Sequence, residues 1–163
     1  MRCRLAEEKA TAILAQYLAR AVEDCGLRVL LFTGPLGSGK THCIRAIVQE
    51  LPGSAHAEVA SPSFSICNRY PVTPPVLHCD LYRTGSSVPE EILEALEDPH
   101  CAVFVEWAEF LPENLRPQAY LALRLSVLGP SERLVTMEAF GDAEKILQSL
   151  TKKLAADHPE LFI

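Results

Sequence analysis

Residues 34–41 read Gly34-Pro35-Leu36-Gly37-Ser38-Gly39-Lys40-Thr41, and this stretch decides the fold. It matches the P-loop pattern G-x-x-x-x-G-K-[ST], which binds nucleotide phosphates, at every fixed position. Glycines let the backbone approach phosphates where a Cβ would clash, and the turned amides form an anion-binding nest. The N-terminal amides and positive dipole end of the following helix strengthen that nest. The stretch therefore predicts a phosphate-binding loop.

The flanking sequence supplies the strand and the helix that a P-loop requires. Residues 28–33 form a short apolar, β-branched run, which is typical of a buried strand. Residues 41–51 place apolar side chains at helical spacing, and Pro52-Gly53 ends the helix. Because strand, loop and helix follow in the required order, a chance match is disfavoured.

P-loop chemistry assigns roles to individual residues. Lys40 is expected to reach the β- and γ-phosphates, and the Thr41 hydroxyl is expected to ligate Mg²⁺. We expect the nucleotide, ATP or ADP, to contact residues 34–41 and also His42 in the first turn of the helix.

Two acidic residues are candidates to complete a hydrolysis site. Asp80 and Glu106 each end an apolar strand, and ligands of α/β proteins bind outside the carboxyl ends of such strands. One acid would hold Mg²⁺ together with Thr41, and the other would orient the attacking water. The sequence leaves open which acid does which. The alternative for each is an ion pair with an arginine such as Arg83.

Two further features have both a functional and a structural interpretation. Ser61-Pro62-Ser63-Phe64 follows the P-loop helix, where P-loop ATPases often sense the γ-phosphate, so we count Ser63 among the nucleotide contacts. The alternative is a plain proline turn. Trp107 is the only tryptophan, and it is at least as well explained by packing as by a role in signalling the nucleotide state.

The order of predicted elements defines the fold class. We expect helices near 6–24, 41–51, 90–97 and 142–156, and strands near 28–33, 65–70, 76–80, 102–107, 120–127 and 133–139. This order predicts an α/β, P-loop NTPase-like sandwich with a mixed, mostly parallel sheet flanked by helices. A C-terminal antiparallel hairpin and helix complete it. Residues 1–163 are expected to form a single domain.

Composition limits the functional class and the setting of the protein. The net charge is −6, which argues against a stand-alone nucleic-acid binder. No apolar run approaches the roughly 18 residues that span a bilayer, and the N-terminus lacks the apolar core of a signal peptide. We expect a cytoplasmic protein that does not bind membranes and is a monomer or weak oligomer when free.

The six cysteines are scattered and are expected to be reduced thiols. Three of them follow a histidine directly, in the pairs His42-Cys43, His78-Cys79 and His100-Cys101. Adjacent residues of a strand point to opposite faces, so such a pair does not readily chelate one zinc ion.

Four motifs together resemble those of the bacterial TsaE family. The family patterns are G-D/E-L-G-A-G-K-T, S-P-T-F, H-x-D-L-Y-R and I-E-W-P. The chain carries its P-loop, Ser61-Pro62-Ser63-Phe64, His78-Cys79-Asp80-Leu81-Tyr82-Arg83 and Val105-Glu106-Trp107 in the same order. The resemblance covers about residues 5–140. The H-x-D-L-Y-R block with E-W downstream is its most specific part, because P-loop kinases and G proteins do not share it.

The resemblance implies an ATPase that works with two proteins, TsaB and TsaD. P-loop chemistry predicts that hydrolysis depends on Mg²⁺ and is weak without a partner. TsaD transfers a threonylcarbamoyl group to an adenosine of tRNA, and the resemblance implies that ATP hydrolysis by TsaE resets that complex. Contact with tRNA would be indirect, through the complex. The lysine and threonine of the family P-loop map to Lys40 and Thr41, its aspartate to Asp80 and its E-W glutamate to Glu106.

The chain departs from the family pattern at four positions. Pro35 replaces an acid and stiffens the loop, Ser63 replaces threonine, His42 replaces a common threonine and Ala108 replaces proline. None of these changes removes an expected metal ligand. They bear on nucleotide affinity and hydrolysis rate more than on the fold.

Two other functions are compatible with the P-loop. One is a small-molecule kinase, although the chain shows no arginine-rich lid segment. The other is a binding module that is gated by intact nucleotide. The sequence does not indicate how adenine is held, whether GTP is excluded, or which surface meets a partner. The loops at 53–57 and 84–89 are candidates for that surface.

Overall fold

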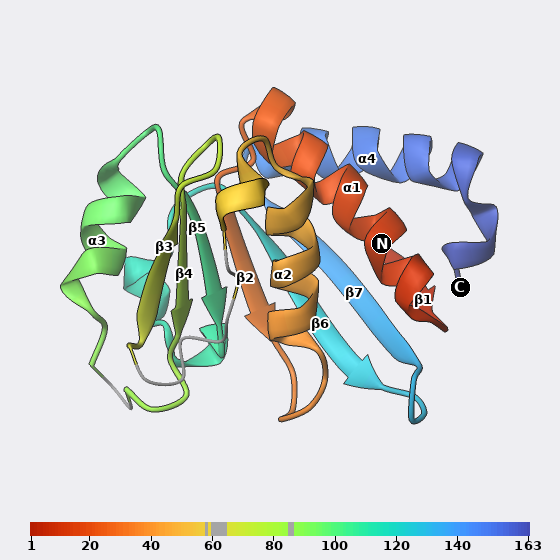
Figure 1. The fold of residues 1–163 in the computed structure, drawn as a ribbon, viewed down its shortest axis with the longest axis horizontal. Coiled ribbons are helices and arrows are strands. Elements are labelled where there is room, and N and C mark those ends of the chain that lie inside the picture. Colours follow the sequence, from red (N-terminus) through yellow and green to blue (C-terminus); the bar gives the residue numbers. More distant parts are fainter. Residues whose placement is uncertain (58, 60–64, 85–86) are drawn as a thin grey trace.

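A seven-stranded mixed sheet with helices packed on it forms the molecule (Figure 1). The computed structural model describes residues 1–57, 59, 65–84 and 87–163. The strands are β1 (Arg2–Leu5), β2 (Val29–Thr33), β3 (Cys67–Tyr70), β4 (Val76–Asp80), β5 (Ala102–Glu106), β6 (Tyr120–Val127) and β7 (Arg133–Phe140). The helices are α1 (Glu8–Cys25), α2 (Lys40–Glu50), α3 (Glu90–Glu97) and α4 (Ala143–Asp157). Short 3-10 turns are η1 (Ser54–His56), η2 (Ala108–Phe110), η3 (Glu113–Leu115) and η4 (Pro159–Leu161).

The sheet has a parallel centre and antiparallel edges. The strand order is β1-β7-β6-β2-β5-β4-β3, and β6, β2, β5 and β4 run parallel to one another. The pairs β3–β4, β6–β7 and β1–β7 are antiparallel, so β1 runs in the same direction as the central four strands. The predicted mixed, mostly parallel sheet is confirmed. The P-loop strand β2 lies at its centre, between β5 and β6.

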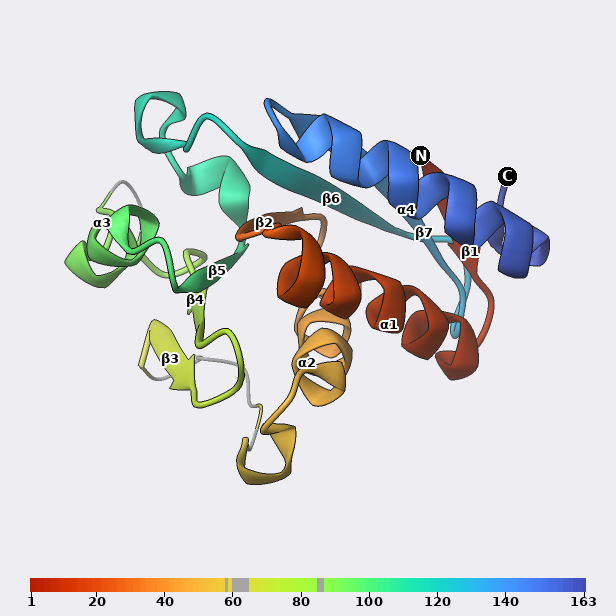
Figure 2. The same ribbon diagram turned by 90° about the horizontal axis from the view of Figure 1, so that it is seen from above.

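Alternating apolar side chains divide the core into two layers. Leu30 and Phe32 of β2 belong to the cluster beneath α1 and α2, whereas Val29 and Leu31 belong to the cluster beneath α3. β5 alternates in the same way, and all of its residues are buried. Strands that are buried on both faces read as continuous apolar runs, which is why β2 and β5 were recognisable in the sequence. Figure 2 shows α1 and α2 on one side of the strands.

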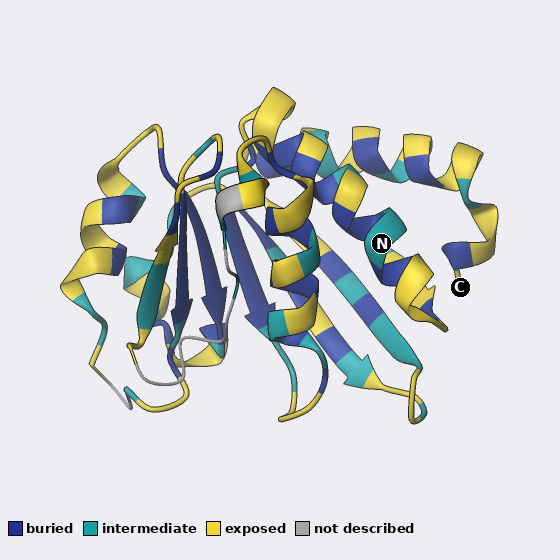
Figure 3. Cartoon of the chain, viewed as in Figure 1, coloured by how far each residue is buried: buried dark blue, intermediate teal, exposed yellow. Residues whose placement is uncertain are grey.

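β6 and β7 are covered on one face only in the described part of the chain. Leu123 and Met137 pack into the cluster beneath α1 and α2, and their neighbours Arg124 and Glu138 are exposed. Figure 3 shows this alternation along the two strands. The alternating pattern is typical of antiparallel strands with one solvated face. None of the helices in the described segments is long and apolar enough to cross a membrane.

The N-terminal strand β1 was not predicted. It pairs with the edge strand β7, with Arg2 opposite Thr136, and the Cys3 side chain is fully buried there. Arg2-Cys3-Arg4-Leu5 does alternate between exposed and buried residues, but four residues give only a weak strand signal. The identity of this strand depends on a partner more than 120 residues away, which propensity does not reveal.

Cys67 and Cys79 form a disulfide bond, so the expectation of a reduced thiol is wrong for this pair. The antiparallel register of β3 and β4 places the two cysteines opposite each other, with their Cα atoms 4.1 Å apart. Directly opposed residues of an antiparallel pair are close enough to be bridged. The spacing of cysteines along the chain does not report strand register. The free cysteines are Cys3, Cys25, Cys43 and Cys101.

Gly34 occupies a position where a side chain does not fit. Its φ is +136°, and a Cβ built on it would lie 2.3 Å from the carbonyl oxygen of Leu125 in β6. We expect Gly34→Ala to lower the free energy of unfolding by about 2–3 kcal/mol, because both backbones have to shift. Urea denaturation measures the change. Gly129→Ala is the matched control, since the nearest atom there is the Glu132 Cβ at 3.6 Å. Equal midpoints for the two variants would contradict the expected clash.

Candidate active site

The P-loop joins the end of β2 to the start of α2 and folds around the side chain of Lys40. The backbone N–H of Ser38 donates to the carbonyl oxygen of Pro35 at 3.1 Å, which closes a turn in the loop. Lys40 Nζ donates to the carbonyl oxygens of Gly34 at 2.8 Å and of Pro35 at 3.1 Å. Proline lacks only the amide donor, so Pro35 still provides this acceptor. The Lys40 side chain therefore extends back to the start of the P-loop, so its ammonium lies inside the loop that is expected to bind phosphate.

Trp107 contacts the P-loop lysine. Lys40 Nζ lies 3.9 Å from the centroid of the indole ring, within cation–π range, and such a contact contributes about 0.5–2 kcal/mol. The indole also packs against the Tyr82 ring, with centroids 4.6 Å apart. The backbone of Trp107 is left-handed, with φ of 55°. The sequence left open whether Trp107 packs or signals the nucleotide state. The structure shows that Trp107 packs, and that the P-loop lysine Lys40 is one of its partners.

Lys40 is almost entirely buried, with 4% of its surface exposed. Burial lowers the pKa of the Lys40 ammonium, and the nearby carboxylates of Glu106, Glu109 and Asp80 oppose that shift. A desolvated ammonium interacts more strongly with an anion than a hydrated one does. The surroundings of Lys40 therefore favour tight contact with an incoming phosphate.

Glu106 lies at the end of β5 and connects the P-loop helix to β4. Its Oε1 accepts a hydrogen bond from Thr41 Oγ1 at 2.7 Å and lies 2.9 Å from His78 Nε2. The Tyr70 hydroxyl lies 3.2 Å from His78 Nδ1. With its proton on Nε2, His78 donates to Glu106 and accepts from Tyr70. The side chain of Glu106 is 4% exposed and that of His78 is 0% exposed. The hydrogen bond between them therefore fixes the orientation of both side chains in the protein interior.

Asp80 ends β4 directly opposite Glu106, because residues 76–80 pair in register with residues 102–106. Its Oδ1 accepts a hydrogen bond from the backbone N–H of Tyr82 at 2.9 Å. A cleft of about 540 Å³ is lined by Lys40, Thr41, Asp80 and Glu106. The structure thus brings together the four residues predicted to carry the chemistry.

The same cleft also contains other predicted contacts. Gly37, Gly39 and His42 line it, together with Leu36, whose side chain is 80% exposed at the tip of the loop. Ser63 lies outside the described residues. Arg83 lines the cleft as well.

A family model described as "Threonylcarbamoyl adenosine biosynthesis protein TsaE" matches residues 5–135. The chain belongs to the TsaE family. This family acts in the biosynthesis of threonylcarbamoyladenosine in tRNA. The match spans the P-loop, both strand-end acids and β6, and it confirms the family resemblance seen in the motifs.

Individual TsaE relatives align over most of the chain. The TsaE protein of Rickettsia felis is 31% identical over 137 residues, which are 82% of this chain and 77% of the relative. The TsaE protein of Mycobacterium tuberculosis is 29% identical over 128 residues, 72% of this chain and 74% of the relative. The crystal structure of Bacillus subtilis YdiB superposes with a TM-score of 0.71 at 25% identity, covering 94% of this chain and 95% of that one. The P-loop NTPase-like fold class is confirmed.

The oxygen atoms of this TsaE site suit Mg²⁺. Magnesium is usually held by one or two carboxylates, phosphate oxygens and waters, not by an all-protein cage. No group of three His, Cys, Asp or Glu side chains that could hold a metal occurs in the described segments. The Thr41 hydroxyl and Glu106 carboxylate already touch, and Asp80 ends the adjacent strand. The Thr41 hydroxyl and one of these two carboxylates would hold the ion, and the carboxylate that already contacts Thr41 is Glu106.

Arg133 is a residue of the TsaE site that sequence reasoning missed. From the start of β7 its Nε donates to the carbonyl oxygen of Ser38 at 3.1 Å and its Nη2 to that of Gly37 at 3.2 Å. Its Nη1 donates to the carbonyl oxygens of Gly129 and Glu132, both at 2.9 Å. Arg133 therefore fastens the β6–β7 turn to the P-loop. Nothing in the local sequence indicates a contact across 95 positions.

His78 was also not assigned a role, although it begins the H-x-D-L-Y-R motif. The motif alternates along β4, so His78 and Asp80 point to the same side of the sheet and Cys79 to the other. This alternation was the available signal that His78 belongs with the acids.

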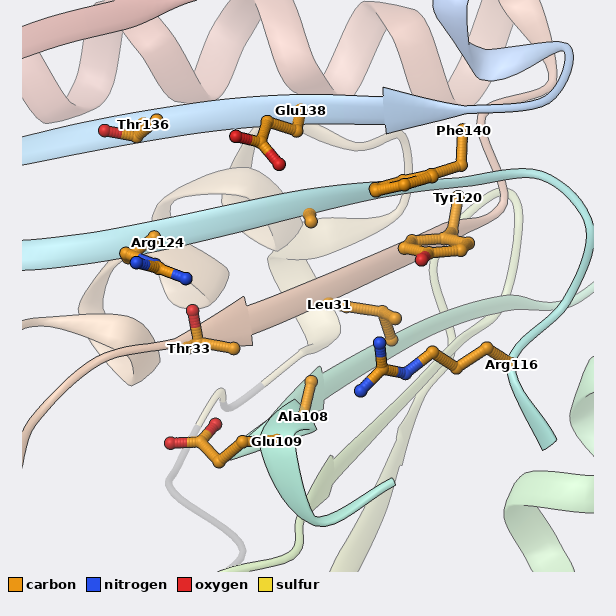
Figure 4. A pocket seen from close by; sticks show the side chains of 11 residues that line it. Leu31, Thr33, Ala108, Glu109, Arg116, Tyr120, Arg124, Thr136, Glu138 and Phe140 are labelled. Atoms are coloured by element: carbon orange, nitrogen blue, oxygen red, sulfur yellow. The ribbon is translucent and has the colours of Figure 1, made fainter. Parts of the chain in front are cut away.

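A separate hollow of about 390 Å³ lies on the open face of β6 and β7 (Figure 4). Arg116, Arg124, Glu109 and Glu138 border it, and the rings of Tyr120 and Phe140 stack at one end with centroids 4.5 Å apart. It contains no residue of the P-loop. It is therefore distinct from the cleft at the P-loop.

Proposed function

We propose that this protein is a Mg²⁺-dependent ATPase that converts ATP to ADP and phosphate. The hydrogen bond between Thr41 and Glu106 is the observation that carries the proposal. It places a carboxylate from a neighbouring strand against the hydroxyl that P-loop enzymes use for the metal. A plain anion-binding loop has no need of such a pair.

Each residue then has a distinct part in the reaction. Lys40 and the loop amides bind the β- and γ-phosphates and offset the charge that develops on them. Thr41 and Glu106 would hold Mg²⁺, which would supply charge neutralisation at the phosphates. Asp80, directly opposite Glu106 in the sheet, is the acid that orients the attacking water.

His78 is a positioning residue in this scheme. Its hydrogen bond fixes the Glu106 carboxylate, and Tyr70 fixes the imidazole in turn. A carboxylate with both neighbours in place needs little reorganisation when nucleotide binds, which is the basis of electrostatic preorganisation.

We further propose that hydrolysis is slow in the isolated protein and that TsaB and TsaD accelerate it, so that each cycle resets the TsaB–TsaD complex in the cytoplasm. Family membership in threonylcarbamoyladenosine biosynthesis supports these partners. P-loop hydrolysis is slow until a further charged group completes the site, and a partner protein is one source of that group.

Phosphate release from ATP tests this proposal. We expect slow release by the protein alone and an increase of about tenfold or more when TsaB and TsaD are added. TsaB and TsaD without this chain provide the background rate. Absence of release under both conditions, with nucleotide still bound, would indicate the alternative of a binding module gated by intact nucleotide. Phosphorylated metabolites in place of free phosphate would indicate a kinase.

A further inference from the structure

The Cys67–Cys79 disulfide lies beside the acid that is proposed to orient water. Cys79 directly precedes Asp80 in β4, and its side chain is 0% exposed in the core cluster beneath α3. Cys67 is the first residue of β3 and is only partly buried. The disulfide therefore ties an edge strand of the sheet to the backbone next to Asp80.

The residue before Cys67 holds Asp80 from the β3 side. The backbone N–H of Asp80 donates to the carbonyl oxygen of Ile66 at 2.8 Å. Ile66 has a φ of 63°, and this left-handed conformation is unfavourable for a β-branched residue. A residue keeps such a conformation only where the surrounding structure imposes it. The disulfide at the next residue and the bond from Asp80 are two constraints that do so.

Few other contacts fix this end of β3. In the described part of the chain β3 is an edge strand that pairs with β4 alone. Its one buried residue is Tyr70, at the end of the strand away from Cys67. Short edge strands with few buried contacts open more readily than central strands. We therefore expect an open disulfide to release Ile66, and with it the hydrogen bond that holds Asp80, while the central strands stay paired.

The two sulfur atoms differ in how accessible they are. Cys67 is partly buried and Cys79 is fully buried, so an attacking thiolate reaches the Cys67 sulfur. The proposed function places the protein in the cytoplasm, where disulfides are rare and usually serve catalysis or redox sensing. Cys79 also occupies the position that the H-x-D-L-Y-R pattern leaves open, so the motif itself does not require a cysteine there.

We propose that Cys67 and Cys79 form a thiol–disulfide switch that fixes or releases Asp80 and so sets the rate of ATP hydrolysis. This inference rests on the proposed function and adds a regulation of the same site. In the oxidised form the disulfide keeps Ile66 and Asp80 in place, and the acid is preorganised for its role. In the reduced form Asp80 loses its support from the β3 side. The P-loop is unaffected, so nucleotide still binds.

Reduction proceeds by two thiol–disulfide exchanges with a dithiol. One thiolate of the dithiol attacks the Cys67 sulfur, the bond between the two cysteines breaks, and Cys79 leaves as a thiolate that takes up a proton. The second thiolate of the dithiol then attacks its own sulfur partner in the mixed disulfide. This step releases the Cys67 thiolate, which is protonated, and leaves the reductant as a cyclic disulfide. Exchange with oxidised glutathione reverses the reaction.

Phosphate release before and after treatment with dithiothreitol tests the switch. We expect reduction to lower release at saturating ATP and Mg²⁺ by about tenfold, because small displacements of a catalytic group have large effects on rate. Oxidised glutathione should restore the rate, and ADP affinity measured by calorimetry should stay nearly unchanged. Thiol titration of the denatured protein should give the four free cysteines before reduction and all six after it.

Two variants separate this disulfide from general effects of the reductant. Cys67→Ser should release phosphate at the rate of the reduced protein, with or without dithiothreitol. Cys25→Ser is the matched control, because Cys25 is an exposed free thiol at the end of α1. This variant should keep both the rate of the oxidised protein and the full response to reduction.

Amide hydrogen exchange measured by NMR tests the structural step without ATP. We expect the Asp80 amide to exchange at least about tenfold faster after reduction, with the amide of Leu31 in the central strand β2 unchanged. Equal acceleration at Leu31 would overturn the switch, because the disulfide would then stabilise the whole fold.

The outcomes distinguish this inference from the proposed function. Equal release by the oxidised and reduced forms, with Cys67→Ser at the same rate, would overturn the switch and leave the ATPase standing. If neither form releases phosphate, the proposed ATPase function fails. An unchanged exchange rate at Asp80 would then overturn the switch as well, whereas faster exchange at Asp80 alone would support the coupling between the disulfide and this residue.

Discussion

Lys40→Ala is expected to reduce ATP turnover by at least about 100-fold. The variant removes the single charge that the structure places inside the P-loop, where it donates to the carbonyl oxygens of Gly34 and Pro35. In the transition state this ammonium would offset charge on the β- and γ-phosphates. Because only 4% of the Lys40 surface is exposed, a solvent cation does not replace the ammonium effectively. Phosphate release at saturating ATP measures the effect.

Lys145→Ala is the control for this variant. Lys145 lies on α4 with its side chain 87% exposed, so its removal should leave turnover unchanged. Loss of the Trp107 contact can destabilise the Lys40 variant, and thermal melting before the assay separates unfolding from loss of catalysis. A folded Lys40→Ala protein with normal turnover would place hydrolysis elsewhere in the molecule.

Glu106→Gln is expected to lower Mg²⁺-stimulated turnover by about 100-fold while leaving metal-free nucleotide binding nearly unchanged. The amide keeps the shape of the carboxylate, and its oxygen still accepts a hydrogen bond from Thr41. The negative charge with which Glu106 would attract the metal ion is lost. A titration of activity with Mg²⁺ should show a weaker apparent metal affinity for this variant.

Asp80→Asn distinguishes the roles of the two acids. If Glu106 holds the metal and Asp80 orients water, Asp80→Asn lowers the rate at saturating Mg²⁺ without shifting the Mg²⁺ midpoint. Glu109→Gln serves as the nearby control, because Glu109 is exposed and acts on Lys40 only through its charge. A larger midpoint shift for Asp80→Asn than for Glu106→Gln would exchange the two assignments.

Much of the fold was predictable from local patterns. β2 and β5 are buried on both faces and therefore read as continuous apolar runs, and α3 matched its predicted bounds at residues 90–97. The hairpin of β6 and β7 was visible because polar turn residues separate two strand-like segments. The short edge strand β1 was missed, because its existence depends on pairing with β7.

The candidate site was predictable only in part. Lys40, Thr41, Asp80 and Glu106 stood out because their residue types at strand ends match phosphate and metal chemistry. The roles of His78, Arg133 and Trp107 depend on contacts between distant segments. The alternation along β4 indicates that His78 faces the same side as Asp80, but it does not indicate that His78 contacts Glu106 and Tyr70. An arginine at the start of a strand carries no signal of its contacts.

The sequence by itself determined that this protein has a phosphate-binding loop between a buried strand and a helix, since the glycines, the lysine and the apolar runs act locally. Tertiary structure alone decided which acid meets Thr41, because β2 and β5 must pair before Glu106 reaches the P-loop helix. It also decided that Cys67 and Cys79 are joined, because strand register places them opposite each other. Backbone conformation follows from neighbouring residues, whereas hydrogen bonds across the sheet depend on pairing that no local segment specifies.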